Sequence, residues 1–353
     1  MRIAVAKPTL ETLIKNKLPV LLKGSPGIGK TDLVKSVAES LGYDLIIAHP
    51  VVDEPVDYKG LPFIVDGEAE FLPYGMLKRL INADNPTIFF LDDLGQALPM
   101  VQAACMNLLL NRAINEQRIS DHVTFVAATN RREDKAGVQG ILEPVKSRFA
   151  AIIEITPHPD DWIDWAIEHG MPSEIIGFIK FRPALLNDFK PTADITNSPS
   201  PRTVAFAGRI YESIMESDAF STHDQKAVAL KESIAGACGE AFAVEFLSWL
   251  KVYDSLPTME QVLADPHGVP IPSTGDELSA LYAFTLMVAE NTPITGDQAF
   301  TVILDRLPKE FQIMAVSFAS KRNRELFNSS AVRNWIVKNH EAILEIGHIV
   351  KEQ

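Results

Sequence analysis

The stretch GSPGIGKT, residues Gly24–Thr31, decides the fold of this 353-residue chain. It matches the phosphate-binding pattern G-x-x-x-x-G-K-[ST] at every fixed position. The glycines let backbone N–H groups wrap a phosphate chain, the lysine reaches the outer phosphates, and the threonine hydroxyl holds Mg²⁺. The stretch follows an apolar strand pattern and opens the helical pattern KTDLVKSVAESL, whose N-terminus favours anions. We therefore predict a phosphate site formed by Gly24, Ser25, Pro26, Gly27, Ile28, Gly29, Lys30 and Thr31, in which Thr31 is also a Mg²⁺ ligand.

Two adjacent aspartates, Asp92 and Asp93 in FFLDDLGQA, follow an apolar run that is typical of a buried strand. Buried carboxylates are costly unless something pairs with them. In P-loop NTPases an Asp in this place holds Mg²⁺, which predicts that role for Asp92. The next carboxylate would orient and deprotonate the attacking water, which predicts Asp93 as the catalytic base. The alternative is that either aspartate caps the helix that follows, a common use of Asp.

A third polar group ends another apolar strand pattern, VTFVAATN, at Asn130. Ligands of open α/β sheets bind at the carboxyl ends of parallel strands. The Asn130 amide is therefore predicted to hydrogen-bond the terminal phosphate or the attacking water. The alternative is that Asn130 is an ordinary turn residue at the end of a strand.

The whole chain divides into an alternating part and a helical part. Up to about residue 156, the apolar runs PVLLKG, LIIAHP, TIFFLDD, VTFVAATN and AAIIEIT alternate with helical patterns such as KTDLVKSVAESLG and PMVQAACMNLLLNR, which predicts a parallel sheet covered by helices. Residues 51–74 interrupt this rhythm and are predicted to form a hairpin or loop. After Pro157 all the patterns are helical, and they span residues 160–170, 202–217, 225–253, 275–290 and 331–350. We predict an α/β P-loop NTPase core over residues 1–156, an all-helical lid over 157–255 and a helical C-terminal extension over 256–353.

Composition limits the class of protein. The chain is 46% hydrophobic with a formal charge of −13, which argues against a general nucleic-acid binder, because phosphate contacts need clustered Lys and Arg. Its two cysteines, Cys105 and Cys238, lie in apolar helical patterns and suit a reducing compartment. No signal-peptide pattern and no run of about 18 apolar residues occurs, so a cytoplasmic location without membrane contact is expected.

The order of these motifs resembles that of the AAA+ ATPases, and among them the MoxR-type branch. The resemblance rests on GSPGIGKT, the irregular VDYKGLPFIVDGEAEFLPYGML, FFLDDLGQA, VTFVAATN and ILEPVKSRFAAIIEI, in that order. It implies ATP and Mg²⁺ as ligands, ATP hydrolysis, and a ring that is most commonly of six subunits. The MoxR branch commonly acts on a protein with a von Willebrand factor A domain, so a protein partner of that kind is expected.

The resemblance also implies roles for two arginines. Arg148 in KSRF is similar to the arginine finger, which reaches the γ-phosphate bound by the neighbouring subunit, where a guanidinium neutralises developing charge. Arg202, at the start of a helical pattern, is similar to the sensor 2 arginine. The alternatives are a surface Arg at a strand start and a solvated Arg at a helix start. Lys30 and Thr31, Asp92 and Asp93, and Asn130 match Walker A, Walker B and sensor 1.

The resemblance extends to two segments outside the nucleotide motifs. The irregular segment VDYKGLPFIVDGEAEFLPYGML resembles an insert of the MoxR branch that faces the ring axis or a partner, which makes Phe63, Phe71 and Tyr74 candidate contact residues. The alternative is that these aromatic side chains pack against the sheet. The segment NEQRISDHV is similar to a second axial hairpin.

Two departures from the family pattern bear on function. Asp93 stands where most of the family has Glu, one methylene longer, so hydrolysis is expected to be slow. GQALP stands where the MoxR branch usually has Asn-Arg-Ala-Pro. The leading hypothesis is a MoxR-type AAA+ ring that remodels or activates a protein partner. The alternatives are a nucleic-acid motor or loader and a nucleotide-dependent scaffold that does not hydrolyse ATP.

Overall fold

The computed structural model describes residues 1–114, 117–134, 140–192, 194–273 and 278–340. The chain forms two compact units. The first comprises Met1–Asp161 together with the short segments Phe189–Ile195 and Ser200–Arg202. The second comprises Trp162–Asp188, Thr196–Pro199 and the chain from Thr203 onward. The predicted division of the helical part at residue 256 stays a prediction.

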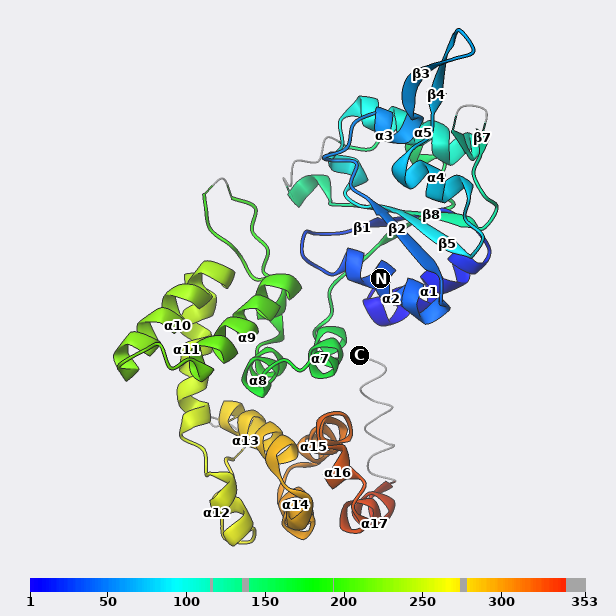
Figure 1. Ribbon diagram of the computed structural model, residues 1–353. Helices are drawn as coiled ribbons and strands as arrows, with labels where there is room; N and C mark the ends of the chain where they lie inside the picture. The colour runs from blue at the N-terminus through cyan, green and yellow to red at the C-terminus, as the bar shows by residue number, and fades with distance from the viewer. Residues whose placement is uncertain (115–116, 135–139, 193, 274–277, 341–353) are drawn as a thin grey trace. The chain divides into compact units, whose positions relative to one another are not determined.

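A five-stranded sheet forms the centre of the first unit (Figure 1). Its strand order is β2-β5-β8-β1-β9 and all neighbouring pairs are parallel. The strands are β1 Val20–Lys23, β2 Asp44–Ala48, β5 Thr87–Leu91, β8 Val123–Thr129 and β9 Ala151–Glu154. These are the five runs that the sequence predicted, and the parallel, helix-covered sheet is confirmed. The carboxyl ends of β1, β5 and β8 therefore meet at one edge of the sheet.

Helices cover both faces of this sheet because its strands are apolar on both sides. Alternate residues of β5 point to opposite faces: Phe89 and Leu91 belong to one buried cluster, Ile88 and Phe90 to the other. The helices are α1 Ile3–Lys15 and α2 Lys30–Leu41 on one face, and α3 Val56–Lys59, α4 Gly75–Ile81, α5 Pro99–Asn111 and α6 Glu143–Lys146 on the other. The sequence patterns predicted α2 and α5, whereas α1 was not predicted.

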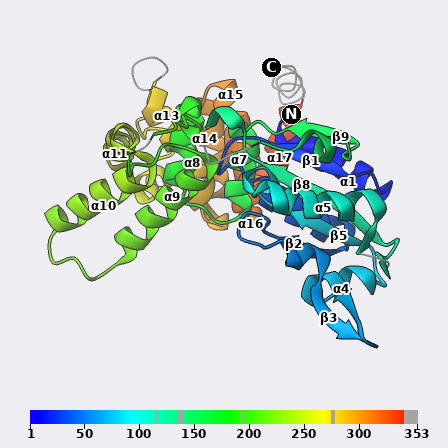
Figure 2. The ribbon, with the colours of Figure 1, turned by 90° about the horizontal axis from the view of Figure 1, so that it is seen from above.

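The predicted hairpin lies within residues 51–74. It is formed by β3 Leu61–Val65 and β4 Glu68–Leu72, which pair antiparallel and project away from the sheet (Figures 1 and 2). Its two-residue turn, Asp66-Gly67, has positive φ at both positions, as the Asp-Gly pair of a tight hairpin requires. A second, short pair, β6 Ala113–Ile114 and β7 Gln117–Arg118, overlaps the second segment that the resemblance marked as a hairpin. Residues 115–116 between them lie outside the described residues.

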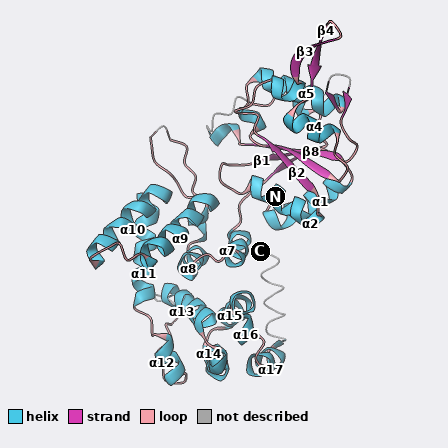
Figure 3. Ribbon diagram, viewed as in Figure 1, coloured by secondary structure: helices cyan, strands magenta, loops and turns pink. Residues whose placement is uncertain are grey.

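The second unit contains helices and no strands among its described residues (Figure 3). A single buried apolar cluster runs from Trp162 to Trp335. Beginning with α7, which starts in the first unit, the helices are α7 Pro159–Glu168, α8 Ser173–Phe181, α9 Pro201–Glu216, α10 His223–Cys238, α11 Glu240–Asp254, α12 Met259–Ala264, α13 Leu278–Asn291, α14 Asp297–Arg306, α15 Lys309–Arg322, α16 Arg324–Phe327 and α17 Ser330–Lys338. None of the helices that the structure describes is both long and apolar enough to cross a membrane.

One predicted helix was wrong in its extent. The pattern from Gln225 to Tyr253 is continuous in the sequence, but the structure divides it into α10 and α11 at Gly239. Gly239 has φ +88°, a conformation that glycine adopts at little cost and that interrupts the helix. The last predicted helix, from Ala331 to Val350, is described only as far as residue 340.

Candidate functional site

The predicted phosphate loop connects β1 to α2. Gly27 and Gly29 have φ +75° and +92°, so the loop uses glycine where the backbone must enter the left-handed region. The ammonium group of Lys30 is buried and donates to the carbonyls of Gly24 and Ser25, both at 2.9 Å, and to Asn130 Oδ1 at 2.7 Å. These three acceptors match the three N–H donors of an ammonium group. The lysine therefore links the loop to the end of β8.

The two predicted Mg²⁺ ligands lie in contact. The Thr31 hydroxyl, in the first turn of α2, donates to Asp92 Oδ2 at 2.7 Å, at the end of β5. Asp92 is buried, and its other oxygen accepts the backbone N–H of Asp93 at 3.1 Å. Hydroxyl and carboxylate oxygens are the hard donors that Mg²⁺ prefers. Thr31 and Asp92 therefore fit as residues that would hold a Mg²⁺ ion.

Asp93 has a left-handed backbone conformation, with φ +57°, immediately after β5. Its Oδ1 atom accepts from Gln96 Nε2 at 2.8 Å and from Asn130 Nδ2 at 3.4 Å. Asp93 precedes the 3₁₀ turn Leu94–Gln96, but its side chain makes no capping hydrogen bond there, and the residue at the capping position of α5 is Leu98. The capping alternative is therefore wrong for Asp93.

Asn130 stands between the lysine and the carboxylate. Its Oδ1 accepts from Lys30, and its Nδ2 donates to Asp93. Both bonds join residues that are far apart in the sequence, 100 and 37 positions respectively. Because these groups follow three parallel strands, the edge of the sheet brings them together. The side chain of Asn130 therefore forms two long-range hydrogen bonds that an ordinary turn residue would not need.

The charge of Lys30 is sensitive to this environment. Burial lowers the pKa of Lys30 to about 8, the charges of Asp93 and Asp92 oppose that shift, and the nearby charge of Arg202 adds to it. A polyanion in the loop would favour the protonated amine. The lysine is therefore more fully protonated when a phosphate chain occupies the loop.

Arg202 lies against the phosphate loop. Its backbone N–H donates to the Gly27 carbonyl at 3.0 Å, and a Cβ atom placed on Gly27 would come within 2.8 Å of Ser200 Oγ and 3.4 Å of Arg202 Cβ. Arg202 is exposed. The segment that starts α9 therefore borders the predicted phosphate site, where the sensor 2 resemblance implies an arginine.

Arg148 follows α6 in a turn before β9. Its Nη1 atom donates to Ser147 Oγ at 3.3 Å, and its Nε is buried without an acceptor among the described residues. The structure gives it no hydrogen bond to the cluster of Lys30, Asp93 and Asn130. Its role at the nucleotide of a neighbouring subunit stays a prediction.

Two residues outside the predicted set also take part in the site: Gln96, and Arg131, a positive charge that directly follows Asn130. Gln96 binds Asp93 directly. Arg131 donates to the hydroxyl of Ser25 in the loop and forms an ion pair with buried Asp134 at 3.0 Å, and the pKa of Arg131 is raised chiefly by its hydrogen bonds to Asp134. The sequence signal for Gln96 was its place in GQALP, where the MoxR pattern differs.

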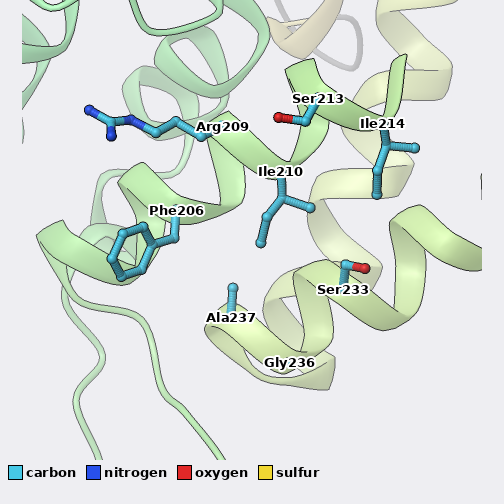
Figure 4. A pocket seen from close by; sticks show the side chains of 8 residues that line it. All are labelled: Phe206, Arg209, Ile210, Ser213, Ile214, Ser233, Gly236 and Ala237. Carbon is cyan, nitrogen blue, oxygen red and sulfur yellow. The ribbon is translucent and has the colours of Figure 1, made fainter. Parts of the chain in front are cut away.

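Outside the sheet edge, the described chain contains two buried thiols and an apolar groove. No group of three or more His, Cys, Asp or Glu side chains with metal-binding geometry occurs among the described residues. Burial raises the pKa of both thiols, Cys105 and Cys238, so neither is a reactive thiolate. A mostly apolar groove of about 590 Å³ lies between α9 and α10, bordered by Phe206, Arg209 and Ser233 (Figure 4). It contains none of the predicted site residues.

The residues at the sheet edge fit ATP with Mg²⁺. The loop supplies backbone N–H groups and a buried ammonium, and Thr31 with Asp92 supplies hard oxygen donors. Mg²⁺ is usually held by one or two protein oxygens together with phosphates and water, rather than by a complete cage of side chains.

Comparison with known proteins completes the description of this domain. Over 102 residues, 27% of this chain, the sequence is 29% identical to Protein MoxR of Methylorubrum extorquens, and the match spans only 28% of that relative's length. The structure is similar to that of RuvB from Thermotoga maritima, a Holliday junction branch migration motor, with 18% identity, a TM-score of 0.41, and coverage of 82% of this chain and 87% of that chain. Residues 20–157 match the model of the ATPase family associated with various cellular activities (AAA). The segment that contains the phosphate loop, both aspartates and Asn130 is therefore a domain of the AAA ATPase family, as the order of the motifs implied.

Proposed function

We propose that this protein is a MoxR-type AAA+ ATPase that hydrolyses ATP with Mg²⁺ in a ring of six subunits and thereby remodels or activates a protein partner. The observation that carries the proposal is the set of contacts at the sheet edge. Lys30 binds Asn130, Asn130 binds Asp93, and Thr31 binds Asp92. These are the groups that phosphate binding, water activation and Mg²⁺ ligation require.

Each residue has a defined task in this proposal. Lys30 neutralises the outer phosphates, and Thr31 and Asp92 hold Mg²⁺, which supplies positive charge to the phosphate oxygens when bound. Asp93 accepts a proton from the attacking water. Asn130 keeps its amide between Lys30 and Asp93, so that it can contact both the terminal phosphate and the water.

The ring is proposed from the resemblance to the AAA+ ATPases, whose arginine finger acts on the nucleotide of the neighbouring subunit. A guanidinium supplied in this way neutralises charge that develops on the transferred phosphoryl group. Arg148 of a neighbouring subunit would supply it. Arg202 would act on the nucleotide of its own subunit, because its backbone already binds Gly27.

A protein partner is proposed from the β3–β4 hairpin together with the MoxR resemblance. Phe63, Ile64 and Phe71 expose 54%, 82% and 47% of their surface on a projecting element. Apolar side chains gathered on an exposed element mark interaction surfaces. Tyr74, also predicted to contact a partner, instead donates to the Asp57 carboxylate at the base of the hairpin. The partner is proposed to carry a von Willebrand factor A domain.

The test is ATP turnover by the purified protein, combined with sedimentation in the presence of ATP and Mg²⁺. Lys30→Ala is expected to abolish turnover, because it removes the buried ammonium from the loop. Lys35→Ala is the matched control: this lysine is on the same helix, α2, but its side chain is 55% exposed. A protein that stays monomeric at all concentrations and has no turnover sensitive to Lys30→Ala would contradict the proposal.

Two other functions give different results in the same assay. A nucleic-acid motor would show turnover that rises with added DNA and loses this rise at high salt. A scaffold would bind ATP and assemble without turnover. The short Asp93 side chain is the feature that favours a scaffold, whereas the acidic chain disfavours a motor.

A further inference from the structure

Gln96 contacts Asp93, the proposed base, through the NH₂ end of its side-chain amide. It ends the 3₁₀ turn Leu94–Gln96, and its Nε2 donates to Asp93 Oδ1 at 2.8 Å. An ionised carboxylate only accepts hydrogen bonds, so the NH₂ end of the amide must face Asp93. The Oε1 atom of Gln96 is consequently directed elsewhere.

The position of the Gln96 amide lowers the stability of the folded protein, so a functional reason for it is expected. Gln96 Oε1 is buried and has no donor among the described residues. Leaving a buried acceptor unsatisfied lowers stability, whereas an apolar side chain of similar size would avoid that loss. Such groups in native proteins often belong to functional sites. The amide is therefore better explained by its contact with Asp93 than by packing.

The two carboxylate oxygens of Asp93 differ in their hydrogen-bond partners. Oδ1 accepts from both Gln96 and Asn130, at 2.8 and 3.4 Å. In the described part of the chain, no donor binds Oδ2. A carboxylate held through one oxygen cannot rotate freely, and its other oxygen keeps a fixed direction. For a base one methylene shorter than Glu, that direction decides whether a water proton is within reach.

We propose that Gln96 is a positioning residue for Asp93: it holds the carboxylate through Oδ1 so that Oδ2 accepts the proton of the attacking water. This inference rests on the proposed ATP hydrolysis. Gln96 acts only through Asp93, so its effect must depend on a carboxylate at position 93. A purely structural role, closing the turn after β5, would not depend on that carboxylate.

The experiment is a double-mutant cycle between positions 96 and 93. Gln96→Met removes the donor at similar length, and Gln96→Leu removes it with a shorter apolar side chain, so that a folding defect in one variant does not decide the result. Each substitution at position 96 is made both in the native protein and in the Asp93→Asn protein. Single-turnover ATP hydrolysis with protein in excess measures slow rates, and a fluorescent ATP analogue measures Kd.

We expect both substitutions to lower the hydrolysis rate about tenfold or more, the scale of a misplaced catalytic group, with Kd for ATP unchanged. In the Asp93→Asn protein the same substitutions should leave the rate nearly unchanged. Gln102→Met is the control, because Gln102 is a buried glutamine whose amide binds Ala97, Gly140 and Leu142 and does not bind Asp93. Its effect should be equal in both proteins.

Other outcomes overturn the inference. An unchanged or faster rate in Gln96→Met and Gln96→Leu shows that Gln96 does not position Asp93 productively. An equal loss with and without Asp93→Asn shows a structural role. If the native protein itself has no turnover that depends on Lys30, the proposed function fails, and that result is distinct from a cycle without coupling.

Discussion

Replacement of Asp93 by asparagine separates base catalysis from folding. The substitution exchanges one carboxylate oxygen for an NH₂ group. The asparagine side chain keeps an Oδ1 atom, which can still accept from Gln96 and Asn130 as the carboxylate oxygen does. Asparagine also tolerates the left-handed backbone, φ +57°, better than most residues. Folding and ATP binding should therefore be preserved while the proton acceptor is lost.

The size of the effect follows from the role of the lost group. A positioned general base contributes about 10²–10⁴-fold to a rate. At about 1.36 kcal/mol for each factor of ten, the barrier should rise by about 2.7–5.4 kcal/mol. We expect the hydrolysis rate to fall by at least about 100-fold. The Kd for ATP and the melting temperature should stay close to those of the native protein.

The assay is phosphate release in a single turnover, beside ATP binding and thermal unfolding. Asp32→Asn is the control, since Asp32 is on α2 close to the loop but its side chain is 73% exposed. It should leave the rate nearly unchanged. Native turnover in Asp93→Asn would refute the role of Asp93 as base. Lost ATP binding would instead place Asp93 among the groups that hold the nucleotide.

Three other substitutions test the phosphate loop, a buried carboxyl group and the length of the base. Gly27→Ala should cost about 1–2 kcal/mol of stability and weaken ATP binding in a titration, because φ +75° strains alanine and its Cβ would push Ser200 away from the loop; native affinity would contradict this. Glu174→Gln should raise the melting temperature at pH 8 more than at pH 5. Burial raises the pKa of the Glu174 carboxyl above its ordinary 4.5, so the folded protein loses stability as the pH rises through that raised pKa and the carboxyl ionises. Gln cannot ionise, and it keeps a side-chain oxygen that accepts from Tyr211. Equal changes in melting temperature at both pH values would contradict this prediction. Asp93→Glu should speed hydrolysis in a single-turnover assay if side-chain reach limits the rate, and an unchanged rate would show that it does not.

Much of the first unit follows from local patterns. The five strands are short apolar runs buried on both faces, and Gly27 and Gly29 of the loop occur where the backbone needs positive φ. Such signals lie within a few residues of one another, so they can be recognised without knowledge of the fold. The hairpin turn Asp66-Gly67 is a further example.

The helical unit was harder to predict for a physical reason. The apolar pattern through Gly239 continues without a break, and only the positive φ that separates α10 from α11 shows that the chain turns there. Helices α8, α12, α14, α15 and α16 were not predicted. Their stability comes from one shared buried cluster, a tertiary contribution that exceeds local propensity.

The sequence by itself determined the phosphate loop, the parallel sheet and the identity of the polar residues that end its strands, because these depend on residue type and short spacing. Only the tertiary structure decided which of those residues meet. The order β2-β5-β8-β1-β9 places β8 between β5 and β1, so that Asn130 lies between Lys30 and Asp93. The turn after β5 directs Gln96 onto the carboxylate, and the start of α9 returns to Gly27. Contacts between residues this distant in the chain are set by sheet order and packing, which no local pattern encodes.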